Sequence, residues 1–476
     1  MASDEHEETS VKQKLSKLHC PFTWEMLDST IKHRMTCMKD QEMQNNASCP
    51  LELLMHSLFQ CYAAVVSADN GTVTEIMRKS EELLIEIQQK QKFHKTVRAI
   101  EHVFYATKCF FLYEIEEMNE LEEILGNIDA EHFTDEELGA LYGCQSVVWS
   151  SLNDFGMDKA VDTAKKAVEK NQDCALWHFI LAKNLRRQRR VIALSSDISD
   201  MEKEHFEIAY AISKNHVFGV YYLQMRIESY YKFNRELDYK QRKAANEKEV
   251  IRIAKDIFKS KPTNYKILLK LARMFLRANL SDEMQLAKEC LDSVEKIAPN
   301  NSTYLHYCAM LYQQSGDYKE AIKYYKKAAE CNNFVAELSY IQYGWETGEL
   351  EPLPHLLRMV KKYNQSITER QIVMLLNIAI TYYTLHKDIA NAAEYFLKAL
   401  TIDPLSKKFK VYYKFLDFDT INISYFLTTY FCPRLINSRS QETCRKIKNL
   451  LSLKDTTDLT MKLKSLSTEP TKERSD

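Results

Sequence analysis

A repeated pair of short amphipathic helices restricts the fold of this chain more than any other feature. The clearest copy spans residues 302–333, and its two helices meet at Ser315-Gly316-Asp317. Small residues in such a pair let the helices approach each other, and aromatic residues fill the space between them. The positions that carry this pattern are Leu305, Ala309, Tyr312, Ala321, Tyr325 and Ala328. The segment therefore predicts one helical hairpin of the tetratricopeptide type.

The same pattern returns on both sides of this copy with a matching spacing. Pro299 and Asn333 lie 34 residues apart, which is the period of a tetratricopeptide repeat. A further 71 residues separate Asn333 from Pro404, enough for two copies, of which the one at 337–363 is degenerate. The matching second-helix positions are Ala287, Leu291, Val294, Ala392, Phe396 and Ala399. We therefore predict an all-α fold, a superhelical solenoid of antiparallel tetratricopeptide-repeat (TPR) helix pairs.

Helix pairs also run through the N-terminal half, although their pattern is less regular. The expected pairs are 51–66 with 73–91, 96–113 with 118–128, 138–152 with the helix of Ala160, Ala164 and Ala167, 174–190 with 201–213, and 216–233 with 243–260. We divide the chain into a flexible N-terminus (1–17), irregular helix pairs that carry the candidate binding groove (18–260), a regular array (261–405), a helical cap (406–451) and a disordered tail (452–476).

Composition and charge exclude several classes of protein. Only 9 Gly and 9 Pro occur in 476 residues, too few for the turns of β-rich folds. The 65 Lys and Arg balance the 66 Asp and Glu, so no global field draws the chain to nucleic acid or anionic lipid. The 12 Cys include no Cys-x-x-Cys pair, and several, such as Cys109 and Cys144, fall within apolar helices. That usage favours a reducing compartment.

No segment of the sequence has the character of a membrane anchor or a leader peptide. The first residues are too polar for a signal peptide. No apolar run approaches the roughly 20 residues that cross a bilayer. We therefore expect a soluble cytoplasmic protein without a membrane partner.

No catalytic, cofactor or metal motif is present. The chain lacks Gly-rich phosphate loops, a His-Glu-x-x-His helix and a Gly-x-Ser-x-Gly elbow. Six glutamates between residues 114 and 123 form an acidic patch, which we interpret as a solvated face rather than a catalytic pair. We expect no enzyme activity, no cofactor, no metal ion and no small-molecule substrate.

Basic stripes on two expected helices are the best candidates for a binding site. The first stripe comprises Lys266, Lys270, Arg273 and Arg277. The second comprises Lys183, Arg186, Arg187 and Arg190. Like charges at helical spacing repel one another, so the second stripe favours an anionic partner. Arginine suits phosphate because its planar group donates two hydrogen bonds. Each stripe also fits an ordinary solvated helix face, and that alternative stays open.

Tyrosine and arginine alternate on the helix between these stripes. Tyr222, Arg226 and Tyr230 recur at every fourth residue. Such a face suits single-stranded nucleic acid, since bases stack on the rings while phosphates contact the guanidinium groups. Tyrosines are also common in the packed interior of helix repeats, so plain packing explains the pattern as well.

The segment Cys20-Pro21-Phe22-Thr23-Trp24 resembles the Cys-His-Phe-Thr-Trp box that opens the interferon-induced proteins with tetratricopeptide repeats. Blocks in the same order extend the resemblance over most of residues 18–405. It implies a divergent member of an antiviral, innate-immune family that holds the 5′ triphosphate or cap of single-stranded viral RNA without catalysis. The residues that the resemblance assigns to RNA contacts are Arg186, Arg273, Arg277 and His306.

Two functions follow from these features. The first is an RNA sensor, with phosphates on the basic stripes and bases on the tyrosines. Its candidate RNA-binding residues are Lys183, Arg186, Arg187, Arg190, Tyr222, Arg226, Tyr230, Lys270, Arg273, Arg277 and His306. The second is a protein-interaction scaffold or adaptor that binds no RNA, the commonest role of such arrays. The sequence does not contain the pattern of Lys and Asn residues that chaperone-tail clamps carry. Protein partners and self-association stay open for both functions.

Overall fold

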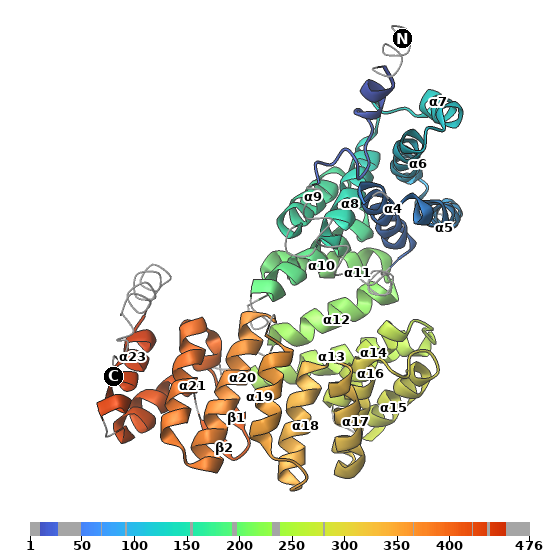
Figure 1. Ribbon diagram of the computed structural model, residues 1–476. Helices are drawn as coiled ribbons and strands as arrows, with labels where there is room; N and C mark the ends of the chain where they lie inside the picture. Colours follow the sequence, from blue (N-terminus) through green and yellow to red (C-terminus); the bar gives the residue numbers. More distant parts are fainter. Residues whose placement is uncertain are drawn as a thin grey trace, which may run out of the picture. The chain divides into compact units, whose positions relative to one another are not determined.

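The computed structural model describes residues 10–26, 49–67, 69–90, 93–152, 156–192, 198–230, 239–278, 281–364, 366–420, 422–435 and 438–453. Within these ranges the chain folds mainly into α-helices, and most neighbouring helices within a unit pack against each other (Figure 1). The helices form two compact units, the first ending at Pro262 and the second beginning at Thr263. The fold is the all-α stack of TPR-type helix pairs that the sequence predicts.

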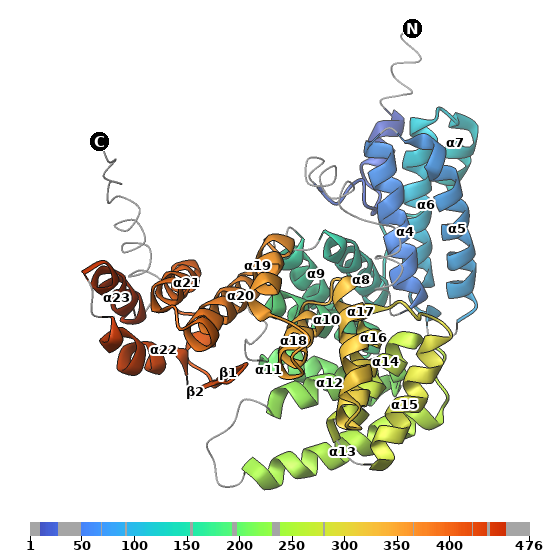
Figure 2. The ribbon, with the colours of Figure 1, turned by 60° about the horizontal axis from the view of Figure 1, so that its bottom comes forward.

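In the first unit the helices from residue 50 onward form consecutive pairs. They are α4 (Pro50–Val66) with α5 (Asn70–Gln88), α6 (Val97–Glu114) with α7 (Met118–Asn127), α8 (Asp135–Ser151) with α9 (Met157–Lys170), α10 (Ala175–Ile192) with α11 (Asp200–Ser213), and α12 (His216–Tyr230) with α13 (Tyr239–Lys259). The two helices of each pair pack together. Helices α4 to α7 lie alongside one another (Figure 2). These bounds follow the predicted pairs to within a few residues.

Helix α8 shows how local sequence sets these pairs. Thr134 precedes it, and the Thr134 side chain accepts a hydrogen bond from the backbone of Glu137 while the Glu137 side chain accepts one from the backbone of Thr134. This capping box satisfies amide groups that would otherwise lack partners at the start of the helix. Within α8, the missing side chain of Gly143 leaves room for the Trp177 ring of α10, which is 1% exposed.

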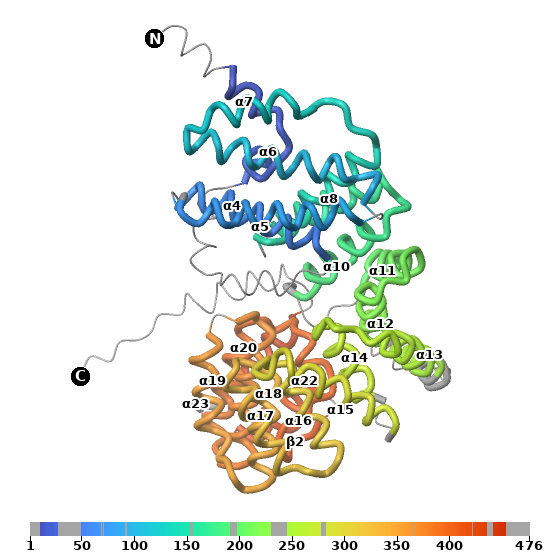
Figure 3. Tube along the Cα trace, turned by 90° about the vertical axis from the view of Figure 1, so that its right-hand side faces the viewer, coloured from blue at the N-terminus to red at the C-terminus, as the bar shows by residue number. Residues whose placement is uncertain are grey.

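The second unit consists of more regular helix repeats. Its helices are α14 (Tyr265–Ala278), α15 (Ser281–Glu295), α16 (Ser302–Gln314), α17 (Tyr318–Glu330), α18 (Phe334–Glu346), α19 (Pro352–Lys362), α20 (Thr368–Thr381) and α21 (Ile389–Ile402), and a π-helical turn, η3 (Tyr382–His386), follows α20. Helices α17 to α20 pack in order, each on the next (Figure 3). The copy predicted at 302–333 is α16 with α17. Gly316 has φ +82° in its turn, a conformation that favours glycine.

The structure of the C-terminal cap differs from the helical cap that the sequence predicts. Instead of helices alone, residues 406–451 include an antiparallel hairpin of β1 (Tyr413–Phe415) and β2 (Phe418–Thr420). The remaining elements are η4 (Lys407–Phe409), α22 (Ile423–Phe426), η5 (Leu427–Phe431), η6 (Cys432–Arg434) and α23 (Ser438–Leu451). In β1 the side chains of Tyr413 and Phe415 are buried and that of Lys414 is exposed. This alternation is the pattern of a strand with one covered face, so the segment forms a strand where a helix was predicted.

The predicted flexible N-terminus also needs correction. Residues 10–15 are helical. Val11 and Leu15 are 5% and 3% exposed and pack in a small apolar cluster with residues of α6 and α7. Burial of these side chains holds the segment, since each removes apolar surface from water. Of the predicted disordered tail, only Ser452 and Leu453 lie within the described residues, and Leu453 is buried.

Each unit has its own apolar core. The core of the first includes Trp177 and Phe206, and that of the second includes Phe396 and Phe409. All four are at most 1% exposed, and full burial of such a side chain stabilises a fold by about 1.5–3 kcal/mol. In the part of the chain that the structure describes, no helix has both the length and the hydropathy that a bilayer span needs.

Candidate nucleic-acid interface

The basic stripe on α10 faces acidic side chains of its own unit. Lys183 Nζ donates to the two carboxylate oxygens of Glu52 on α4, at 2.9 and 2.8 Å. The two side chains are 18% and 3% exposed. Burial opposes the charged form of Lys183, but the Glu52 carboxylate together with Tyr221 and Cys49 outweighs burial and raises the pKa of the ammonium. This ion pair joins α4 to α10 within the unit.

Arg186 is almost completely enclosed. Only 6% of its side chain is exposed. One terminal nitrogen donates to Oε1 of Glu228 at 2.7 Å, and the other donates to Oε1 of Gln224 at 3.0 Å. The guanidinium carbon lies 5.7 Å from the centre of the Tyr221 ring, a cation–π distance. Burial lowers the pKa of Arg186 to about 10, so the group stays charged at neutral pH.

Glu228 on α12 accepts hydrogen bonds from three arginines of α10. Besides Arg186, Arg189 donates to its Oε2 at 3.0 Å and Arg190 donates to its Oε1 at 2.8 Å. Burial opposes ionisation of this carboxyl, yet the three guanidinium groups hold its pKa at about 2. The carboxylate thus lies where several arginine forks converge, which is an arrangement that also suits phosphate.

Arg189 belongs to this network although the sequence pattern missed it. It donates to both oxygens of Glu202 on α11, at 2.9 and 3.0 Å. The two side chains are 8% and 1% exposed. Its spacing of three residues from Arg186 is a signal that could have found it. Its glutamate partners lie on other helices, so their approach is a property of the tertiary structure.

We call Lys183, Arg186, Arg187, Arg189 and Arg190 the α10 cluster. Arg190 is 40% exposed, and Arg187 is also partly exposed. The ion pairs above supply three carboxylates, those of Glu52, Glu202 and Glu228. Four of the five cations, those of Lys183, Arg186, Arg189 and Arg190, pair with these three carboxylates.

The face of α12 that alternates rings and cations is partly engaged in internal contacts. Arg226 donates to the hydroxyl of Tyr222 at 2.8 Å and to Oδ1 of Asn246 at 2.7 Å. The Tyr222 ring stacks on Tyr210, with ring centres 5.3 Å apart. Contacts of this kind are expected if the tyrosines of this face serve ordinary packing inside the helix repeat. Tyr230 ends α12, and its side chain lies outside the described residues.

The neighbouring tyrosine, Tyr221, was also missed from the sequence. Its ring meets Phe179 edge-to-face with centres 5.2 Å apart, and it lies beside Arg186. Its position next to Tyr222 in the sequence was the signal that could have identified it. Of the pair, Tyr221 therefore contacts α10, while Tyr222 contacts Tyr210 of α11.

The basic stripe on α14 lies in the second unit. Lys270, Arg273 and Arg277 are partly exposed, while the apolar residues of the opposite face are buried. These are Ile267, Leu268, Leu271, Met274 and Phe275. On α16, burial and the positive charge of Arg273 lower the pKa of His306 to about 4. His306 is therefore neutral near Arg273, with its ring centre 5.8 Å from that of Tyr325.

The described cysteine and carboxylate side chains do not assemble a metal site. Across the described ranges, no three His, Cys, Asp or Glu side chains converge as metal ligands. Burial raises the pKa of Cys20 and of Cys109 to about 12. These thiols are protonated members of the core, in agreement with the prediction for Cys109.

Comparison with known proteins identifies a family model and solved structures that are similar to this chain. The family model of the second ARM domain of tetratricopeptide repeat protein 21 matches residues 249–452. No curated protein matches the chain. The solved structure of the human IFIT1 dimer with m7Gppp-AAAA has a TM-score of 0.62 at 12% identity, over 96% of this chain and 100% of that chain. The human IFIT1 dimer with PPP-AAAA has a TM-score of 0.60 at 12% identity, with the same coverage. At this identity, the likeness shows a distant relation in fold between helical-repeat proteins.

Proposed function

We propose that this chain is a non-catalytic RNA-binding protein that holds the 5′ end of single-stranded RNA at the α10 cluster, as an antiviral effector of innate immunity. The observation that carries the proposal is the convergence of Arg186, Arg189 and Arg190 on the single carboxylate of Glu228. A terminal phosphate offers the same kind of acceptor with more oxygens and more charge, so it competes for the same donors.

The more exposed cations of the α10 cluster give an RNA phosphate access to the site. Arg190 and Arg187 are the more accessible members, so they meet the RNA first. Arg186 binds the phosphate once the Glu228 side chain changes its rotamer and releases the guanidinium group. In this proposal, Tyr221 offers an aromatic surface next to the phosphate.

The other candidate residues complete the proposed RNA path in each unit. In the first unit, Tyr222, Arg226 and Tyr230 contact bases and backbone after the 5′ end. In the second unit, Lys270, Arg273 and Arg277 hold later phosphates, and His306 donates or accepts a hydrogen bond as a neutral ring.

Two further observations support an RNA ligand. The human IFIT1 structures that share the fold contain m7Gppp-AAAA and PPP-AAAA. The segment at 20–24 resembles the opening box of the interferon-induced family, and the immune role in the proposal rests on that resemblance. Both a cap and a triphosphate present the phosphate oxygens that arginine forks bind.

Binding of one RNA with a 5′ triphosphate, a cap or a 5′ hydroxyl, at two salt concentrations, tests the proposal. We expect the triphosphate or capped form to bind most tightly. The double variant Arg187→Glu/Arg190→Glu should bind about tenfold more weakly or worse. Its salt slope should be shallower by about 1.4, because two phosphate contacts are lost from a single strand.

A matched control separates local contacts from a general change in charge. Arg78→Glu/Arg252→Glu reverses two exposed arginines outside the cluster, whose side chains are 56% and 63% exposed. This variant should bind RNA like the wild type. Equal affinity and equal salt slope for the wild type and the cluster variant would overturn the proposal.

The same ion pairs also support the alternative function, a protein-interaction scaffold without RNA binding. Glu228 and Glu202 satisfy Arg186 and Arg189 inside the fold, and such a network holds three helices together without any ligand. If none of the three RNA forms binds, while Arg187→Glu/Arg190→Glu lowers the melting temperature and the control variant keeps the wild-type value, the scaffold is the better account of the cluster.

A further inference from the structure

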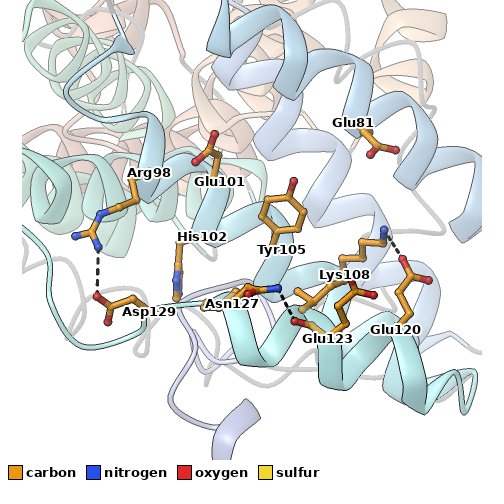
Figure 4. A pocket seen from close by; sticks show the side chains of 12 residues that line it. Glu81, Arg98, Glu101, His102, Tyr105, Lys108, Glu120, Glu123, Asn127 and Asp129 are labelled. Atoms are coloured by element: carbon orange, nitrogen blue, oxygen red, sulfur yellow. Dashed lines mark hydrogen bonds and ion pairs between the residues drawn. The ribbon is translucent and has the colours of Figure 1, made fainter.

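A second charged site lies elsewhere in the first unit, and its sign is opposite. Helices α5, α6 and α7 and the residues after α7 line a pocket of about 570 Å³ (Figure 4), a volume typical of ligand sites. Glu81 of α5, Glu101 of α6 and Glu123 of α7 line it together with Tyr105 and His102. Glu123 belongs to the acidic patch that the sequence analysis interpreted as a solvated face.

The positive charges of the pocket are already paired. Arg98 donates to both Glu137 oxygens at 2.7 Å and lies 3.4 Å from a carboxylate oxygen of Asp129. Lys108 Nζ lies 2.7 Å from Glu120. Figure 4 shows the Arg98 to Asp129 and Lys108 to Glu120 pairs at opposite ends of the pocket. Neither cation is therefore available to neutralise the remaining carboxylates.

Three carboxylates of the lining have no ion-pair partner among the described side chains. Glu81 and Glu123 are exposed, and Glu101 is partly exposed and accepts a hydrogen bond only from the Gln88 amide, at 2.7 Å. They come from three different helices. The partly exposed ring of Tyr105 lies between them (Figure 4). An aromatic ring among carboxylates attracts an organic cation through both charge and the ring face.

His102 adds a buried polar group to the same pocket. The residue is 5% exposed, and its Nε2 accepts a hydrogen bond from the backbone nitrogen of His19 at 3.0 Å. Burial, with the charge of His19 adding to it, lowers the pKa of His102 to about 4. The neutral ring therefore carries its proton on Nδ1.

This Nδ1 has no hydrogen-bond partner among the described residues. The backbone carbonyl of Asp129 favours the protonated ring but does not meet hydrogen-bonding geometry. A buried donor without a partner is rare, because it has lost its water without replacement. His102 thus offers a donor at a pocket whose other free groups are acceptors.

We propose that this pocket binds a basic segment of a partner protein. A lysine or arginine side chain of the partner places its cationic group among Glu81, Glu101 and Glu123, beside the ring of Tyr105. A main-chain carbonyl of the same segment accepts the hydrogen bond from His102 Nδ1. The aliphatic stem of the side chain packs on Ile124 and Ile128, which also line the pocket. This site is independent of the RNA site, which attracts the opposite charge.

The choice of a peptide rests on the combination of groups. Three dispersed carboxylates and a ring suit an extended cation. The donor of His102 calls for an acceptor on the same ligand, which a peptide supplies and a simple polyamine lacks. An acidic pocket and a separate basic cluster in the same unit would let one chain join an RNA to a basic protein.

Fluorescence anisotropy with a labelled Gly-Lys-Lys-Lys-Gly peptide tests the proposal on the full chain. The triple variant Glu81→Gln/Glu101→Gln/Glu123→Gln keeps the size of each side chain and should weaken binding about tenfold or more. The matched control Glu169→Gln/Glu330→Gln/Glu349→Gln removes three exposed carboxylates outside the pocket and should bind like the wild type. The same peptide with acetylated lysines should not bind.

Competition identifies the class of ligand. Spermine should displace the peptide only at much higher concentration, since it has cations but no carbonyl acceptor. Equal affinity for spermine and peptide would overturn the peptide assignment, and stoichiometric binding of Ca²⁺ with loss of the peptide would overturn the organic cation. Unchanged peptide binding by the triple variant would overturn the site itself.

Discussion

At the scale of single residues, Glu228 controls the electrostatics of the proposed RNA site. Its carboxylate accepts hydrogen bonds from Arg186, Arg189 and Arg190 and remains ionised because these groups hold its pKa at about 2. Without it, Arg186 would be a buried cation without its carboxylate partner. The side chain therefore stabilises the unit and also occupies the place that a phosphate would take.

The substitution Glu228→Gln should lower stability and raise the response to anions. Loss of one partner of a buried ion pair costs about 3–5 kcal/mol, so the apparent melting temperature should fall. Inorganic phosphate or triphosphate should restore it, because the three arginines then lack their carboxylate. Thermal unfolding with and without 10 µM to 10 mM phosphate, roughly the range that charged sites of moderate affinity need, measures both effects.

The control for this experiment is Glu249→Gln. Glu249 pairs with Arg252 on the surface, with side chains 40% and 63% exposed, and exposed pairs contribute about 1 kcal/mol or less. This variant should melt like the wild type and should gain nothing from phosphate. If phosphate raises the melting temperature of the wild type as much as that of Glu228→Gln, the carboxylate does not compete with anions.

At the scale of elements, close packing between α8 and α10 depends on one glycine. A Cβ at Gly143 would lie 2.4 Å from the ring of Trp177, which is buried at 1% exposure. The sequence showed two helices here and predicted their bounds well. It did not show that α10 crosses α8 at this glycine, because Gly143 within an apolar helix looks like any small residue of a repeat.

Gly143→Ala should therefore destabilise the chain although alanine is the better helix former. The helix propensity favours alanine by about 1 kcal/mol, while overpacking a buried site costs about 1–3 kcal/mol, so the clash decides the sign. Gly126→Ala in α7 is the matched control, since a Cβ there meets nothing within 4 Å. Thermal unfolding should rank Gly126→Ala at or above the wild type and Gly143→Ala below it; the opposite order would contradict the packing.

At the scale of the whole molecule, the 65 basic and 66 acidic residues nearly cancel. Two regions of the first unit nevertheless carry charges of opposite sign. The α10 cluster is positive, and the pocket of α5 to α7 is negative. Several groups in these regions and in the second unit have shifted pKa values. His102 and His306 have pKa values lowered to about 4, and Glu137 and Glu228 have values lowered to about 2.

These shifts predict stability that falls with acid in two stages. A histidine with a lowered pKa binds its proton more readily when unfolded, so stability drops as the pH falls from about 6.5 towards about 4. A glutamate with a lowered pKa has the same sign, and its contribution is lost as the pH falls from about 4.5 towards about 2. Apparent melting temperatures between pH 7 and pH 2, roughly the span of both windows, measure this.

The variant Glu137→Gln/Glu228→Gln provides the comparison. It should start less stable at neutral pH, and its melting temperature should change less below about pH 4.5. A variant curve parallel to the wild-type curve over the acid range would show that these two carboxylates do not cause the loss.

The sequence by itself determined the helix pairs, because the alternation of small and large residues at helical spacing follows from how two helices approach. Its errors came where local pattern gives way to tertiary packing: residues 10–15 are helical because they pack on α6 and α7, and the cap contains a hairpin. It also found the arginines of α10 but not their partners. Only the tertiary structure decided that Glu228 and Glu202 meet those arginines, and that three glutamates and a buried histidine share one pocket, because each set combines side chains from different helices, and the packing of those helices decides which side chains meet.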